Sequence, residues 1–190
     1  MSDRGRLIVF AAPAGGGKTT VIKAVRALHP EWSFSCSATT REPRPGEVDG
    51  LDYYFLSREE FLRRVAAGEF IEHEVVHGNL YGTLRSYIER ALVHKQTMVL
   101  DLDVKGAANI KRYYPEALTI FIKPPSLSVL HERLTRRGTE STEVIARRLA
   151  RAEMEMAQAD SFDCVVINQE IEQAVADTLR CIEHGRPLTA

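Results

Sequence analysis

The chain has 190 residues, of which 44% are hydrophobic and 27% are charged, and its formal net charge is −1. This composition is that of an ordinary globular domain and excludes a wholly disordered or fibrous protein. The balance of charges also argues against a basic nucleic-acid binder. At this length one core can bury about 70% of the surface that the unfolded chain exposes, so no disulfide or metal is needed for stability.

The cysteines and the apolar runs bear on where the protein works. Cys36, Cys164 and Cys181 are far apart and form no Cys-x-x-Cys pair, so they predict neither a disulfide framework nor a zinc–thiolate site. The apolar run at residues 7–12 passes into a glycine-rich loop instead of a signal-peptide cleavage site. No stretch approaches the ~20 apolar residues of a membrane helix. We therefore expect a soluble, cytoplasmic protein with no membrane partner.

Strand-like and helix-like segments alternate along the chain, which favours an α/β fold with a mostly parallel central sheet flanked by helices. Residues 7–10 form a continuous apolar run typical of a strand buried on both faces. Further buried strands are predicted at 97–100, 118–122 and 165–167.

Two helices are predicted from the spacing of apolar residues. The first covers 18–28 and ends before Pro30. The second follows Asn168. Their apolar stripes comprise Val21, Ile22, Val25 and Leu28 in the first helix, and Ile171, Val175, Leu179 and Ile182 in the second.

Two stretches interrupt the alternation and predict the domain organisation. Residues 37–86 are polar and rich in turn residues, with one helix that the capping box Ser57-x-x-Glu60 opens and that ends near Gly68. Residues 126–151 are helical and arginine-rich with a tip at Gly138-Thr139, as expected of a mobile cover over an anion. We therefore expect a single domain with a core (1–36, 87–125 and 152–190), an inserted α+β subdomain (37–86) and a lid (126–151).

The sharpest motif lies between the first predicted strand and the first predicted helix. It reads Ala12-Pro13-Ala14-Gly15-Gly16-Gly17-Lys18-Thr19. This is the context that a phosphate-binding P-loop requires, because glycines let backbone N–H groups converge on phosphate oxygens at a helix N-terminus. Lys18 would reach the β- and γ-phosphates, and the Thr19 hydroxyl would ligate Mg²⁺. The alternative is a glycine-rich turn without this function.

Position 12 departs from the P-loop pattern, which begins with glycine. If Ala12 had a positive φ, the alanine would be strained by about 1 kcal/mol.

Acidic residues follow the predicted strand at 97–100. Asp101 and Asp103 would lie at the carboxyl edge of a parallel sheet, where α/β proteins bind ligands. A P-loop enzyme needs such a residue to hold Mg²⁺ or its water shell. We therefore predict a magnesium site at Thr19 and Asp101, direct or through water; the alternative is a pair of solvated aspartates.

The segment His73-Glu74-Val75-Val76-His77 matches the zinc-protease pattern H-E-x-x-H. That chemistry needs both histidines on one helical face, but adjacent valines favour a strand and Gly78 follows at once. Residues four apart in a strand lie about 13 Å from each other and cannot share one zinc ion. We expect no zinc.

Two arginines in a proline-rich segment, Arg41 and Arg44, predict a second phosphate site. Guanidinium groups bind phosphate oxygens in pairs, so two of them suit a monophosphate dianion. The alternative is a solvated basic loop.

Several segments of the chain together resemble the guanylate kinase family. They are Ser37-x-x-x-Arg41-x-x-Arg44-Pro45-Gly46, Gly68-Glu69-Phe70-Ile71-Glu72, Asn79-x-Tyr81-Gly82-Thr83, Leu100-Asp101-x-Asp103-Val104 and Arg133-Leu134-x-x-Arg137-Gly138-Thr139, within a resemblance that spans about residues 7–182. The resemblance implies a P-loop NTPase core, a GMP-binding subdomain at 37–86 and a lid at 126–151. The implied reaction is Mg²⁺-dependent transfer of the γ-phosphoryl group of ATP to GMP, giving ADP and GDP, in purine nucleotide metabolism and GMP recycling. The partners would be the small molecules ATP and GMP, with dGMP as a second candidate acceptor.

The resemblance also implies roles for residues on the acceptor side. Glu72 would accept hydrogen bonds from guanine N1 and N2, and Thr83 would address O6. Asp101 and Asp103 would lie between the acceptor and Mg²⁺. The GMP phosphate would be held by Ser37, Arg41, Arg44, Tyr53 and Tyr81.

On the donor side, residues 12–19 and Thr20 would surround the ATP phosphates, and Asn168 would lie near the adenine. Arg133, Arg137 and Arg148 of the lid would close on the ATP phosphates and the transferring group. Because phosphoryl transfer depends mainly on alignment and charge neutralisation, we predict no general base. The residues expected to act in catalysis are Lys18, Arg41, Arg137 and Arg148.

Two other functions fit parts of the pattern. A kinase for another phosphorylated acceptor, such as a sugar phosphate, would not need the base-reading pair Glu72 and Thr83. A non-catalytic interaction module would not need an intact phosphate loop.

Overall fold

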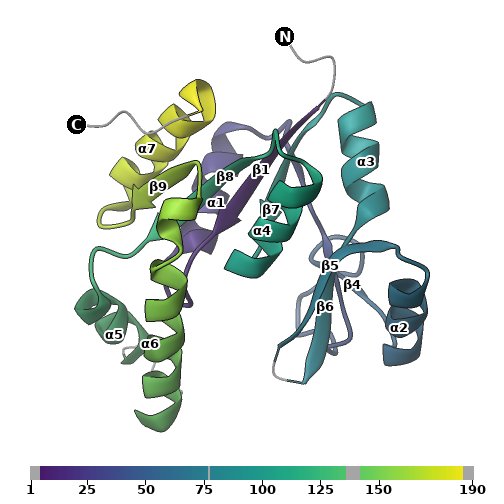
Figure 1. The fold of residues 1–190 in the computed structure, drawn as a ribbon, viewed down its shortest axis with the longest axis horizontal. Helices are drawn as coiled ribbons and strands as arrows, with labels where there is room; N and C mark the ends of the chain where they lie inside the picture. Colours follow the sequence, from purple (N-terminus) through teal and green to yellow (C-terminus); the bar gives the residue numbers. More distant parts are fainter. Residues whose placement is uncertain (1–4, 77, 136–141, 186–190) are drawn as a thin grey trace.

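A computed structural model describes residues 5–76, 78–135 and 142–185 of the chain. Its central sheet has five strands in the order β2-β7-β1-β8-β9, and every neighbouring pair is parallel (Figure 1). This confirms the predicted α/β class with a mostly parallel sheet. The strands are β1 (Arg6–Ala11), β2 (Ser33–Phe34), β7 (Thr97–Asp101), β8 (Leu118–Lys123) and β9 (Cys164–Ile167).

Helices cover both faces of this sheet, so the central strands are buried on both sides. Alternate residues of β1 point to opposite layers. Leu7 and Val9 pack with residues of α3 (Arg85–Val93) and α4 (Val104–Tyr113). Ile8 and Phe10 pack with residues of α1 (Lys18–Leu28) and α7 (Ile171–His184) on the other face. This arrangement explains why the strand sequence is a continuous apolar run.

Two predicted core residues are exposed instead. Leu28 belongs to the predicted stripe of α1 but is 59% exposed, because it is the last residue of that helix. Ile167 was expected in a buried strand but is 55% exposed, because it ends β9 at the edge of the sheet. Both predictions were wrong because each residue lies at the end of its helix or strand, beyond the layer that covers the rest of that element.

The cysteines are free thiols, as the sequence predicted. Cys164 and Cys181 are buried in the layer between the sheet and α1 and α7.

A second sheet has four strands in the order β4-β3-β6-β5. The pairs β3–β6 and β5–β6 are antiparallel, whereas β3–β4 is parallel. A small core joins it to α2 (Arg58–Ala66), where the Phe61 and Phe70 rings stack 4.4 Å apart. Its strands are β3 (Ser37–Thr39), β4 (Tyr53–Phe55), β5 (Phe70–Val76) and β6 (Asn79–Leu84), all within the predicted insertion 37–86.

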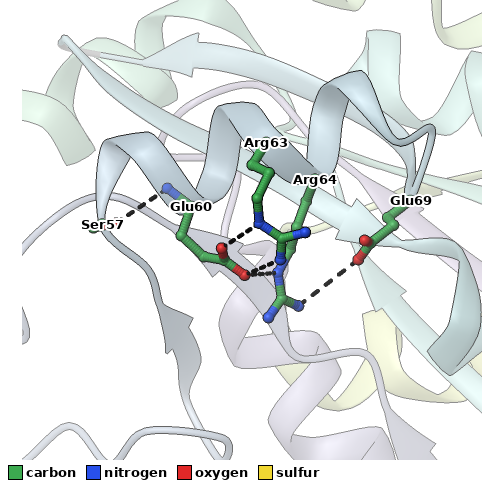
Figure 2. A network of polar contacts seen from close by, with 5 residues as sticks. All are labelled: Ser57, Glu60, Arg63, Arg64 and Glu69. Atoms are coloured by element: carbon green, nitrogen blue, oxygen red, sulfur yellow. Dashed lines mark hydrogen bonds and ion pairs between the residues drawn. The ribbon is translucent and has the colours of Figure 1, made fainter.

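Helix α2 shows half of the predicted capping box (Figure 2). The Ser57 hydroxyl accepts a hydrogen bond from the Glu60 N–H at 3.1 Å. The Glu60 carboxylate does not return to Ser57 but accepts from Arg63 at 2.8 Å and Arg64 at 2.7 Å. These two guanidinium groups, Arg63 first, lower the pKa of Glu60 to about 2. The capping box fails because two cations attract the carboxylate more strongly than one N–H group does.

Helices α5 (Leu127–Thr135) and α6 (Thr142–Met156) pack against each other through Leu130, Leu134, Ile145 and Ala152. A short helix, η1 (Ala159–Ser161), follows α6. In Figure 1 the α5–α6 pair and the second sheet lie on opposite sides of the central part of the molecule, with α4 between them. The predicted tip at Gly138-Thr139 lies outside the described residues.

Asp163 links three elements near the start of β9. Its carboxylate accepts hydrogen bonds from the Lys111 ammonium group of α4, and from the Thr119 N–H and hydroxyl of β8, each at 2.8 Å. Burial acts to raise the pKa of Asp163, but the bonds from Lys111 and Thr119 outweigh it and hold the pKa below its usual value.

We expect Asp163→Ala to lower the free energy of unfolding by about 1–3 kcal/mol, because it leaves polar groups of Lys111 and Thr119 without their acceptor. Since the folded-state pKa is lowered, this contribution is present above the pKa of the unfolded chain and is lost as the pH falls through the folded-state value. Urea unfolding at several pH values measures both effects. Asp160→Ala, at an exposed position nearby, is the control, and equal stability of the two variants would contradict the prediction.

Candidate functional site at the carboxyl edge of the central sheet

The parallel strands bring their carboxyl ends to one edge of the central sheet. Phe10 of β1 is in register with Asp101 of β7, and Lys123 of β8 with Ile167 of β9. The next residues continue these contacts, since the Leu102 N–H donates to the Phe10 carbonyl at 3.0 Å and the Asn168 N–H to the Lys123 carbonyl at 2.7 Å. The segments after β1, β7 and β9, which hold many of the predicted site residues, therefore lie side by side.

The loop between β1 and α1 alternates in backbone handedness. Gly15 and Gly17 have φ of 88° and 87°, and Gly16 lies between them without a positive φ. Such alternation turns successive N–H groups toward one point at the helix N-terminus, which is the arrangement that binds phosphate.

Ala12 is not strained by this turn. Among the described residues, Lys95 is the only residue other than glycine that has a positive φ. Ala12 is buried among apolar residues of the layer that contains α1 and α7. The conditional expectation of strain at this position therefore does not apply.

Asn168 ties the loop to the end of β9. Its side-chain N–H donates to the Gly16 carbonyl at 2.9 Å, and its own carbonyl accepts from Arg133 of α5 at 2.9 Å. A cavity of about 430 Å³ lies here, lined in part by five residues expected to bind ATP: Gly15, Gly17, Thr20, Arg133 and Asn168. Of the loop's remaining predicted residues, Pro13 and Gly16 are buried and Ala14 is half-buried.

Lys18 connects the loop with β7. Its ammonium group forms an ion pair with the Asp101 carboxylate at 2.5 Å and donates a hydrogen bond to the Leu102 carbonyl. Thr19, the next residue, is exposed and lines a cavity of about 610 Å³ together with Asp101.

The oxygen atoms of Thr19 and Asp101 are the hard ligands that Mg²⁺ prefers, so this residue pair fits the predicted metal. In the part of the chain that the structure describes, no three His, Cys, Asp or Glu side chains group to hold a metal ion. A magnesium ion here would therefore rely on water and phosphate oxygens as well, as is usual for this ion.

A third cavity, of about 140 Å³, lies between the two sheets. Asp101, Asp103 and Leu102 line it from the central sheet, and strands of the second sheet supply the rest. Six of the predicted acceptor residues meet in this cavity: Ser37, Tyr53, Glu72, Tyr81, Asp101 and Asp103.

The half-buried Glu72, which lines this cavity, pairs with the buried Thr83 behind it. The Thr83 hydroxyl is fully buried and donates to a Glu72 carboxylate oxygen at 2.6 Å. Burial raises the pKa of Glu72, and the hydrogen bond from Thr83 offsets part of that rise. Helix α4 approaches from the other side, since a Cβ atom at Gly106 would lie 3.4 Å from the second carboxylate oxygen.

The two predicted phosphate-binding arginines differ in their surroundings. Arg41 pairs with the Glu47 carboxylate at 2.8 Å, also bonds Tyr81, and lies with its guanidinium carbon 5.3 Å from the Tyr53 ring. The bond to Glu47, and secondarily the one to Tyr81, raises the pKa of Arg41. Arg44 is exposed, and its backbone N–H donates to Glu47 at 2.7 Å. The structure thus brings Arg41, but not the Arg44 side chain, against residues of the acceptor cavity.

The arginines of the predicted lid are only partly placed. Arg133 lies on α5 at the cavity beside Asn168, and Arg148 is half-buried on α6. Arg137 lies outside the described residues.

Comparison with known proteins identifies the family. Residues 4–185 match the family model described as "Guanylate kinase". The chain belongs to the guanylate kinase family. Among its relatives, a guanylate kinase of Chlorobaculum tepidum is 51% identical over 91% of this chain and 89% of its own length. A guanylate kinase of Symbiobacterium thermophilum is 47% identical over 94% of this chain and 84% of its own length.

A solved structure agrees with these relatives. The crystal structure of guanylate kinase from Anaplasma phagocytophilum matches with a TM-score of 0.75 and 32% identity, and the match covers 100% of this chain and 90% of that one. The fold class, the family and the nucleoside monophosphate kinase activity predicted from the sequence are therefore confirmed.

The zinc-protease alternative fails on local structure. His73 lies in β5, which is a strand over Phe70–Val76, whereas the protease pattern needs a helix. His77 lies outside the described residues.

In the described part of the chain, no helix is both long and apolar enough to span a membrane.

Two residues near the acceptor cavity had no role in the sequence-based prediction. Glu47 holds Arg41, and Glu74 lines the cavity beside Glu72. The position of Glu74 was within reach of sequence reasoning, because residues two apart on a strand face the same side. The pairing of Glu47 depends on the fold of an irregular loop and carries no comparable signal.

Proposed function

We propose that this member of the guanylate kinase family transfers the γ-phosphoryl group of ATP to GMP while both nucleotides are bound, with Mg²⁺, at the carboxyl edge of the central sheet. The observation that carries the proposal is the position of Asp101. This residue pairs with Lys18 of the phosphate loop, and lines both the cavity that contains Thr19 and the cavity that contains Glu72. Asp101 therefore connects the phosphate loop on the donor side with the acceptor cavity.

On the donor side, the residues 12–20 are proposed to surround the ATP phosphates, with Lys18 as the cation for the β- and γ-phosphates. Asn168 and Arg133 are joined by a hydrogen bond at the cavity beside Gly15 and Gly17. We assign this cavity to the nucleoside and phosphate groups of ATP.

On the acceptor side, Glu72 is proposed to select the base. Guanine carries hydrogen-bond donors at N1 and N2, whereas adenine has an acceptor at N1, so a buried carboxylate favours guanine. A site built around such a group rejects an analogue that leaves it unpaired. Thr83 fixes the carboxylate and would turn its hydroxyl group toward O6 of the bound base. Neither residue distinguishes GMP from dGMP, since both contact the base.

The GMP phosphate would be bound by Ser37, Tyr53, Tyr81, Arg41 and Arg44. Of these, Arg41 is already held against Tyr53 and Tyr81. Arg44 is exposed, so its contact with phosphate would require the side chain to turn inward.

Catalysis is proposed to depend on alignment and on neutralisation of charge as the phosphoryl group moves. Lys18, Arg41, Arg137 and Arg148 would supply positive charge around that group, and Asp103 would lie between the acceptor and the metal. When bound at Thr19 and Asp101, Mg²⁺ would neutralise negative charge on the phosphate oxygens.

The proposed division of the chain follows these roles. Residues 1–36, 87–125 and 152–190 form the core, 37–86 the GMP-binding subdomain and 126–151 the lid. The reaction would serve purine nucleotide metabolism and GMP recycling in the cytoplasm, and the three free cysteines are compatible with a reducing compartment.

The direct test measures ADP formation with Mg²⁺·ATP and with GMP, dGMP, AMP, CMP or UMP in turn. We expect turnover with the guanine nucleotides and at least about 100-fold lower kcat/KM with the others, because only guanine satisfies Glu72. Lys18→Ala, which removes the proposed phosphate cation, should abolish turnover and retain cooperative unfolding. Folded wild-type protein that binds ATP but turns over none of these acceptors would contradict the proposal.

We expect Glu72→Gln to reduce kcat/KM for GMP by about 100-fold, because an amide cannot accept both guanine hydrogen bonds as a carboxylate does. The KM for ATP should stay within about twofold, since Glu72 lines the acceptor cavity. Glu69→Gln is the matched control, because Glu69 is a half-exposed carboxylate just before β5 and does not line the acceptor cavity. Near-normal use of GMP by Glu72→Gln would remove Glu72 from guanine recognition.

A further inference from the structure

The acceptor cavity is unusually rich in acidic groups for a site that would bind a nucleotide dianion. Four carboxylates line it: Glu72, Glu74, Asp101 and Asp103. Glu72 accepts a hydrogen bond from Thr83, which offsets part of the rise in its pKa that burial causes. The other three carboxylates each face a cation.

These three pairs come from different parts of the chain. Asp101 pairs with Lys18 at 2.5 Å. An oxygen of Glu74 lies 3.5 Å from the Lys105 ammonium group, and an oxygen of Asp103 lies 3.6 Å from the Arg151 guanidinium group. Lys18 belongs to the phosphate loop, but Lys105 and Arg151 have no part in the proposed function so far.

Arg151 is the more informative of the two, because it comes from α6. Its guanidinium Nε donates to Glu155, one turn further along α6, at 2.8 Å, and Glu155 is only 12% exposed. Glu155 thus fixes the direction of the Arg151 side chain toward Asp103. Lys105 is 80% exposed, so its side chain is held less firmly in one position.

The partner of Arg151 is itself fixed. Asp103 caps α4 by accepting from the Gly106 N–H at 2.7 Å, and its interaction with the neighbouring Glu74 carboxylate of β5 raises the pKa of Glu74. Three elements that are distant in the sequence, β5, α4 and α6, therefore meet at this carboxylate. A continuous chain of polar contacts runs from Glu155 through Arg151 and Asp103 to Glu74.

We propose that Arg151 is a positioning residue of the acceptor site, which balances the charge of Asp103 and Glu74 and makes α6 part of the site that receives a nucleoside monophosphate. This inference rests on the proposed function, because it takes the 140 Å³ cavity as the acceptor site. Without Arg151, an incoming phosphate dianion meets the same carboxylates with one cation fewer. The guanidinium group is half-exposed, so its effect is moderate and sensitive to salt.

A purely structural role for Arg151 makes different predictions. In that case its contact with Glu155 would only support α6, and its loss would lower stability without a preference for one substrate. The two roles are separated by comparing the KM values for the two nucleotides.

The test compares the wild-type enzyme with Arg151→Ala, Arg151→Lys and Arg147→Ala. Arg147 is an exposed arginine on the same helix and has no role in the proposed site. In dilute buffer, Arg151→Ala should raise the KM for GMP by about three- to tenfold, with the KM for ATP within about twofold. The increase should shrink in 0.5 M NaCl, at about which concentration charges several ångströms apart are screened. Arg151→Lys should restore most of the affinity, and Arg147→Ala should match the wild type.

The inference is overturned by an unchanged KM for GMP, by an equal rise in the KM for ATP, by an effect that salt does not reduce, or by a lysine variant as poor as alanine. If Arg151→Ala loses its cooperative thermal transition, Arg151→Gln replaces it and the same comparisons decide. Wild-type protein that does not use GMP would overturn the proposed function, and this inference with it. A wild-type enzyme that uses GMP together with an unaffected Arg151→Ala would overturn this inference alone.

Discussion

The register of the parallel central sheet is the constraint on which the site depends. Because β1, β7, β8 and β9 run in the same direction and end at matched positions, the residues that follow them emerge along one edge. The phosphate loop, Asp101 and Asn168 are neighbours for this reason alone. Hydrogen bonds between these segments, such as Asn168 to the Gly16 carbonyl, then fix the loop shape that the glycines permit.

Opposite charges are paired locally around the site, which the formal net charge of −1 for the whole chain does not reveal. Lys18 with Asp101 and Arg41 with Glu47 are pairs within or beside the cavities. Within the described part of the chain Glu72 forms no ion pair; its half-buried carboxylate instead accepts a hydrogen bond from the Thr83 hydroxyl, and burial raises its pKa. A site that holds two nucleotides needs this separation of roles, because cations must remain near phosphates and an isolated carboxylate must remain near the base.

Much of this organisation could be predicted from local sequence. Patterns of only a few residues were enough for three features: the apolar run of β1, the glycines at positions 15–17 and the helix that begins at Lys18. Failures occurred where a distant or competing partner decides the outcome. Glu60 does not complete the predicted capping box, because Arg63 and Arg64 attract its carboxylate. Leu28 and Ile167 were predicted to be buried but are exposed, because burial depends on where the neighbouring layer ends.

The contacts of Arg151 show the same limit for the site itself. Nothing in the sequence near residue 151 points to Asp103 or Glu74, which lie 48 and 77 positions away along the chain. Only the folded chain brings the Arg151 side chain of α6 within 3.6 Å of the Asp103 carboxylate. By contrast, the base-reading pair Glu72 and Thr83 was expected through resemblance to the family, and the antiparallel register of β5 and β6 places the two opposite each other.

The central claim is that one edge of the sheet holds donor and acceptor together. It is tested most directly by calorimetric titration with adenosine and guanosine joined 5′ to 5′ through a polyphosphate chain. The account predicts that one molecule of this compound binds per chain, that ATP alone and GMP alone each compete with it, and that Lys18→Ala and Glu72→Gln each weaken it. Competition by ATP but not by GMP, or binding that Glu72→Gln leaves unchanged, would contradict the claim that the two sites share this edge.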